Sequence, residues 1–127
     1  MRFIGYLKAL LSRVVSPFYY RQERLAISRR PYSMAEFTDY FSSRGMDADG
    51  ASAVWEALRE CADFKDLTPY PQDNILKVYG LADQDLDDCI LDSLSRCGRR
   101  IPPSAETIIL PPVETVADLV KVVAQMK

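Results

Sequence analysis

The sequence contains no histidine among its 127 residues. Histidine is the commonest general base in enzymes and the usual partner of a serine or cysteine nucleophile. Without it, a zinc site would need three cysteines and a carboxylate, and the cysteine spacing gives such a site no support. We therefore expect a protein that is not an enzyme, with no catalytic residues, no metal site and no bound cofactor.

Cysteine is also scarce, at three residues: Cys61, Cys89 and Cys97. The count is odd and contains no C-x-x-C pair, so a disulfide framework is not expected. This usage fits a reducing, cytoplasmic setting. Cys89 and Cys97 follow the apolar spacing of one predicted helix and fit a core role. Cys61, near the end of another helix, is the candidate for a reactive thiol.

The chain lacks any apolar run near the ~20 residues needed to span a bilayer. Its N-terminus does not have the pattern of a signal peptide, because Lys8 and Arg13 interrupt the apolar positions. Residues 3–18 instead predict an amphipathic helix. We assign residues 1–31 to a basic amphipathic helical extension, which either packs on the rest of the chain or makes a peripheral membrane contact through residues 1–30; packing is the commoner use of such a helix.

Charge is divided unevenly along the chain. Residues 1–30 hold seven basic residues and one acid, a net charge of +6, so the remainder holds nine basic and 17 acidic residues, a net charge of −8. The acidic remainder argues against nucleic acid as a ligand. It favours a protein partner with a basic surface, and a small acidic protein of the immunity or antitoxin type stays an alternative.

Helical periodicity and capping patterns fill most of residues 32–127, which we assign to one helical domain. Ser33 and Glu36 form a capping-box pattern ahead of a helix to about residue 43. Asp47 or Asp49 precedes a helix over about 50–62, with Val54, Trp55, Leu58 and Cys61 along one stripe. A short turn over 73–79 places Ile75, Leu76 and Val78 inside, a helix follows over about 85–97, and Thr115 with Asp118 opens the last helix. An extended or one-turn segment is expected over 107–110. The fold class is therefore all-α, a small helical bundle.

The stretch from Tyr79 to Pro103 has a Gly turn at Gly80, a group of carboxylates, an amphipathic helix and an Ile101-Pro102 exit. With the helix before it and the Thr115-Val116 opening of the last helix, this order resembles the four-helix bundle of acyl carrier proteins over about 80 residues. The resemblance implies an acyl-carrier-like domain. In carriers an Asp-Ser-Leu motif starts the second helix, and its serine holds phosphopantetheine.

Here the matching position reads Gln84-Asp85-Leu86, so an acid replaces the serine. The chain is similar to carrier-like bacterial proteins of unknown function that have an acidic pair there, as in Asp87-Asp88. A literal Asp92-Ser93-Leu94 does occur, but it lies mid-helix, five residues before Gly98. Ser93 is thus the weak alternative site for a phosphopantetheine arm in a genuine acyl carrier.

The acids of this helix have two interpretations. Carboxylates at a helix N-terminus gain about 0.3–1 kcal/mol each from the helix dipole, so they could serve as caps. Capping needs only one or two of them, however, and like charges at i,i+4 repel. The functional interpretation is a partner-binding acidic helix that carries no prosthetic group, formed by Asp83, Asp85, Asp87, Asp88 and Asp92.

Overall fold

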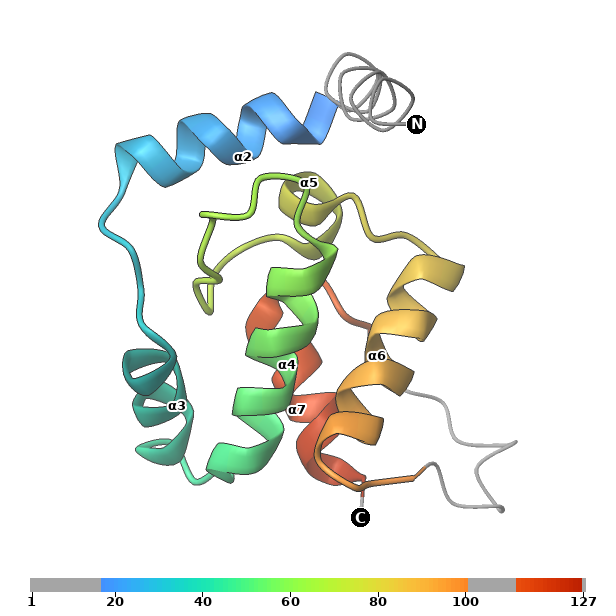
Figure 1. Cartoon of the computed structure of the whole chain (residues 1–127). Coiled ribbons are helices and arrows are strands. Elements are labelled where there is room, and N and C mark those ends of the chain that lie inside the picture. The colour runs from blue at the N-terminus through green and yellow to red at the C-terminus, as the bar shows by residue number, and fades with distance from the viewer. Residues whose placement is uncertain (1–16, 101–111, 127) are drawn as a thin grey trace, which may run out of the picture.

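The protein is all-helical in the computed structural model, which describes residues 17–100 and 112–126 (Figure 1). Within these ranges the only β-type pairing is an isolated bridge between Asn74 and Thr115. The predicted all-α class is confirmed. The first sixteen residues of the predicted extension, the Ile101-Pro102 exit and the 107–110 segment lie outside the described residues. The helices are α2 (Pro17–Ser28), α3 (Met34–Ser42), α4 (Ala48–Cys61), α5 (Ile75–Tyr79), α6 (Gln84–Arg96) and α7 (Val116–Gln125).

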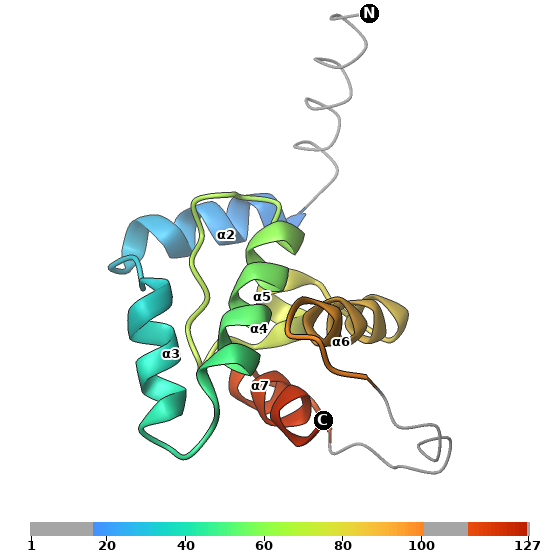
Figure 2. The ribbon, with the colours of Figure 1, turned by 60° about the horizontal axis from the view of Figure 1, so that its bottom comes forward.

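Helix α4 lies at the centre of the molecule. It packs against α3 on one side and against α6 and α7 on the other, and α6 also contacts α7 (Figures 1 and 2). Asp47 caps α4 by accepting a hydrogen bond from the Gly50 backbone N–H at 2.7 Å. The predicted stripe residues Val54, Trp55 and Leu58 are buried. Small residues beyond the stripe, Ala51, Ala53 and Ala57, are buried too, so this helix has neighbours on several sides.

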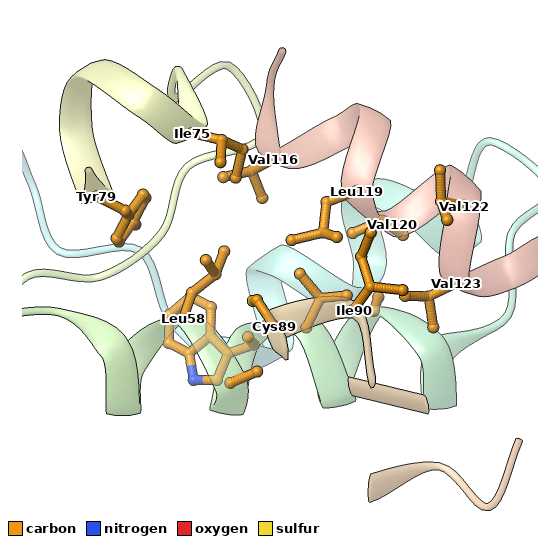
Figure 3. Packing of buried hydrophobic residues seen from close by; sticks show 14 of the residues in the cluster. Leu58, Ile75, Tyr79, Cys89, Ile90, Val116, Leu119, Val120, Val122 and Val123 are labelled. Atoms are coloured by element: carbon orange, nitrogen blue, oxygen red, sulfur yellow. The ribbon is translucent and has the colours of Figure 1, made fainter. Parts of the chain in front are cut away.

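The core lies between α4, α6 and α7 and is mainly aliphatic. Figure 3 shows Leu58 of α4 and Ile90 of α6 facing Leu119 and Val120 of α7. Burying such side chains contributes about 1.5–3 kcal/mol each relative to exposure. A second, aromatic part of the core joins α3 to α4, where the rings of Phe37 and Trp55 have centroids 5.3 Å apart.

Helix ends agree closely with the capping patterns. Ser33 and Glu36 form a reciprocal capping box at α3, and Thr115 and Asp118 form another at α7, both as predicted. Asn74 caps α5, because its side-chain oxygen accepts a hydrogen bond from the Lys77 N–H. The sequence pattern did not predict this cap. Each of these polar side chains satisfies a backbone N–H that the helix itself leaves without a partner.

Two predictions of burial are wrong. Helical spacing predicts Cys61 on the inward stripe of α4, but Cys61 is exposed, and Ala62 takes the inward position just past the helix end. The sequence predicts Leu76 inside, but its side chain is 54% exposed, because Ile75 and Tyr79, one turn apart, already occupy the inward face of the short α5.

Helix α2 packs on the region around α5 rather than standing apart (Figures 1 and 2). Its Gln22 is fully buried, donates to the Val78 carbonyl at 2.8 Å and accepts from the Phe64 N–H at 2.9 Å. Just beyond the helix, Arg29 forms a bidentate ion pair with Asp73, with nitrogen–oxygen distances of 2.6 and 2.8 Å. The part of residues 1–31 that the structure describes therefore belongs to the packed body of the protein.

Candidate functional site

The five predicted partner-binding acids do not share one face of α6. At about 100° per residue, Asp85, Asp88 and Asp92 fall within an arc of roughly 60°, and Asp87 lies roughly 130° away from its centre. Asp83 stands at the N-cap, before the first helical residue. The buried face, which carries Cys89, Ile90, Ser93 and Leu94, lies between Asp87 and the three-acid arc.

The three-acid arc borders a cavity between α6 and the C-terminal end of α4. The cavity has a volume of about 350 Å³. Its charged lining is acidic, with Glu60 of α4 facing the α6 acids, and apolar surface comes from Leu81 and the two thiols. We call this cavity the acidic groove; it is lined by Glu60, Cys61, Leu81, Asp85, Asp88, Cys89 and Asp92.

Arg96 neutralises the far end of the groove. Its guanidinium contacts Asp92 at 3.1 Å, Glu56 at 3.3 Å and also Glu60, so it links the end of α6 to α4. The near end has no such cation: within residues 17–100 and 112–126, neither Asp85 nor Asp88 forms an ion pair. Unpaired negative charge therefore concentrates at the first two turns of α6.

Asp83 does not act as a helix cap. Its side chain makes no capping hydrogen bond, and its backbone has a positive φ of 46°, which non-glycine residues rarely adopt. Asp85 and Asp87 lie in the first turn, where the helix dipole favours them. The capping interpretation thus accounts for part of the acid cluster through the dipole, but no side-chain cap uses the remaining carboxylates.

Two thiols meet on the wall of the groove. Cys61, exposed at the last residue of α4, shares a side-chain hydrogen bond with Cys89, which is buried on α6 (Figure 3 shows Cys89 in the core). This bond lowers the pKa of the Cys61 thiol from 9.0 to about 7, against the opposing effects of burial and of the acids Asp92 and Glu60. The same bond, together with burial, raises the pKa of Cys89.

Ser93 is completely buried, and its hydroxyl donates to the Cys89 carbonyl at 2.8 Å. This is the back-bonding geometry of a serine within a helix. A transferase could not reach this oxygen without opening the contact between α6 and the core. The structure thus gives Ser93 a packing role, whereas Asp85, in the first turn of α6, is exposed.

Sequence reasoning missed two members of this region, Glu60 and Arg96. The signal for Arg96 was present, because Asp92 and Arg96 have the i,i+4 spacing of a helical ion pair. Glu60 had no comparable signal, since its place beside α6 depends on how α4 and α6 pack.

In the described parts of the chain, no group of three or more Cys, Asp or Glu side chains is arranged to hold a metal ion. Nor does any helix there have the length and apolar character needed to cross a membrane. Comparison with family models, curated proteins and solved structures finds no match to this chain.

Proposed function

We propose that this protein is a non-enzymatic, acyl-carrier-like interaction module without a prosthetic group, and that it binds a basic protein surface through the acidic groove. The observation that carries the proposal is the pair of exposed acids Asp85 and Asp88, which have no ion-pair partner within the described residues. Like charges on one helix face destabilise the helix slightly when no cation pairs with them. A role in binding a basic partner would account for the presence of these two acids.

The order of elements supports the carrier-like part of the proposal. Helix α4, the loop ending at Gly80, helix α6 and helix α7 follow one another in the order that the resemblance implies. Asp85 occupies the position at which a carrier would have its modified serine, and a carboxylate cannot replace the hydroxyl that attacks coenzyme A. The burial of Ser93 supports the absence of an arm at the alternative position.

The groove suits a lysine or arginine side chain from the partner. Its acids would meet the charged end, and Leu81 with the thiols would contact the aliphatic stem. Attraction between such groups speeds association and weakens with salt, because the Debye length falls from ≈10 Å at 0.1 M to ≈3 Å at 1 M. The expected partner surface is therefore a basic helix or loop, held by contacts at the near end of the groove.

The test compares two charge reversals on the same helix. A partner is first trapped in extracts of the native host by carbodiimide, which joins carboxylates to lysines, and the captured protein is then purified. Asp85→Lys/Asp88→Lys should weaken its binding by at least about tenfold, because both groove contacts turn repulsive. Asp83→Lys/Asp87→Lys changes net charge equally but away from the groove, and should weaken binding far less. Equal losses of affinity in both variants would show that binding depends on net charge alone and would refute the groove as the binding site.

The absence of an arm has its own test. The intact protein is incubated with coenzyme A and a broad-specificity phosphopantetheinyl transferase, alongside a genuine carrier as a positive control. We expect the mass of this protein to stay unchanged while the control gains the arm. An adduct on any serine would restore the genuine acyl carrier as the correct interpretation.

A further inference from the structure

Cys61 and Cys89 have contrasting environments although they lie on the wall of the same groove. Cys61 ends α4 and is exposed to solvent, whereas Cys89 is only 2% exposed on the inward face of α6. They belong to helices α4 and α6, which pack against each other, and both thiols line the acidic groove. Cys97, the third cysteine, is separate from them, with its sulfur 3.6 Å from the Leu94 carbonyl oxygen. One thiol is thus accessible to a reagent, and a second, buried thiol lines the same groove.

We propose that Cys61 and Cys89 form a dithiol site that hydrogen peroxide converts to a disulfide, with Cys61 as the residue oxidised first. This inference goes beyond the proposed binding function and does not depend on any partner. It rests on the placement of two thiols from different helices in the lining of one groove and on the exposure of only one of them.

The chemistry needs only the two thiols and one peroxide molecule. The Cys61 thiolate attacks one peroxide oxygen, a sulfur–oxygen bond forms, the oxygen–oxygen bond breaks, and the departing hydroxide leaves as water after taking a proton. The sulfur of Cys89 then attacks the Cys61 sulfenic acid, a sulfur–sulfur bond forms, and a second water leaves with the Cys89 proton. Two thiols are oxidised by two electrons, and the peroxide is reduced to two waters.

The surroundings of Cys61 select the kind of reagent. The groups facing it are the Cys89 thiol, the carboxylates of Asp92 and Glu60, and the ammonium of Lys65. The Cys89 contact favours the Cys61 thiolate, which is the reactive form. Two nearby carboxylates, with Asp85 and Asp88 on the same groove, repel anionic reagents but do not affect an uncharged one. Hydrogen peroxide is small and uncharged, so it fits this site better than anionic disulfides such as oxidised glutathione.

The first experiment treats the full-length protein with hydrogen peroxide and maps the products by mass spectrometry. Lys65, Lys77 and Arg96 separate the three cysteines into different tryptic peptides, so each pairing is distinguishable. The wild type and Cys97→Ser should both give the linked Cys61 and Cys89 peptides and lose two hydrogens. In Cys89→Ala, a sulfenic acid at Cys61 should be trapped by dimedone, because no second thiol resolves it. Cys61→Ala should leave Cys89 reduced at the same peroxide dose.

Two results would overturn the proposal: oxidation of Cys61 to the sulfinic acid in the wild type while Cys89 stays a thiol, or a disulfide that includes Cys97. If the alanine variants fail to fold, the wild-type peptide map decides alone. The reagent selectivity has a separate measurement, the ratio of Cys61 alkylation rates with uncharged iodoacetamide and anionic iodoacetate. Asp85→Asn/Asp88→Asn should lower this ratio by roughly fivefold at low salt, and an unchanged ratio would refute the electrostatic part.

Discussion

At the scale of single residues, a few buried polar side chains connect distant parts of the chain. Gln22 and Asp73 are both buried, and each joins α2 or its end to the region between α4 and α5. Asp73 also accepts from the Tyr70 N–H at 3.0 Å, so its carboxylate has partners on several sides. Leaving such a group without its partner costs more than the bond is worth in isolation.

The Arg29–Asp73 pair gives a direct prediction for stability. Arg29→Met should lower the free energy of unfolding by about 3 kcal/mol, because a carboxylate whose side chain is 6% exposed loses its cation. The measurement is urea denaturation followed by circular dichroism. The neighbouring Arg30 pairs with Glu36 on the exposed surface, so Arg30→Met is the matched control and should have a much smaller effect. Equal effects of the two substitutions would contradict the assignment of Arg29 to a buried network.

The thiol contact predicts how alkylation of Cys61 depends on pH. With a pKa of about 7, the Cys61 thiolate should become populated as pH rises through 7, and its rate with iodoacetamide should rise with the same midpoint. Cys89→Ala removes the hydrogen bond that lowers this pKa, so the midpoint should move to higher pH. The rates are measured on the Cys61 peptide in a Cys97→Ser background. A midpoint that Cys89→Ala leaves in place would show that the bond does not set the reactivity.

At the scale of elements, helices were predictable wherever a polar cap preceded an apolar stripe. Ser33, Asp47 and Thr115 each mark a helix start in the sequence and cap that helix in the structure. Residues at helix ends were less predictable, because their burial depends on which neighbour arrives there. Cys61 shows this limit: helical spacing predicted it inside, yet the chain leaves α4 at that point and turns Ala62 inward.

The candidate site was predictable only in part for the same reason. Local sequence placed five acids at the start of α6, but their division between two sides of the helix follows from which face packs on α4 and α7. Glu60 is 25 or more residues away along the chain from the α6 acids that line the same groove. No local pattern encodes such a meeting, because it depends on the packing of two helices.

Gly80 gives a prediction for how α2 meets α5. A Cβ atom there would lie 2.8 Å from the Phe18 ring of α2, whereas at Gly98, which has the same φ of 70°, it would meet no described atom within 4 Å. Alanine in this left-handed conformation costs roughly 1 kcal/mol at either position. Gly80→Ala should therefore destabilise the protein by an additional ~1–3 kcal/mol through overpacking, measured by thermal denaturation.

The control for this prediction removes the ring. In Gly80→Ala/Phe18→Ala the clash disappears, so the two substitutions should show a favourable coupling in a double-mutant cycle. If Gly80→Ala and Gly98→Ala have equal effects, or if the cycle shows no coupling, Phe18 does not pack on Gly80 as described.

At the scale of the whole molecule, the uneven distribution of charge has a partial structural explanation. Of the seven basic residues in the first thirty, Arg29 and Arg30 pair with acids of the following segment, Asp73 and Glu36. These contacts favour packing over separation for the part of the basic segment that the structure describes. The boundary after residue 31 marks a change in composition. The two ion pairs and the hydrogen bonds of Gln22 nevertheless join residues on its two sides.

The final prediction tests whether that boundary separates two folding units. A chain of residues 32–127 should be less stable than the full-length protein by at least ~3 kcal/mol, because it leaves Asp73 without Arg29 and leaves the Val78 carbonyl and Phe64 N–H without Gln22. The full-length variant Gln22→Ala/Arg29→Met should reproduce most of this loss, since it removes the same contacts while keeping the chain. Thermal denaturation compares all three proteins. An unchanged melting temperature for residues 32–127 would show that α2 does not contribute to the stability of the rest of the chain. Because Gln22 is completely buried, we expect instead that residues 32–127 need α2 for full stability.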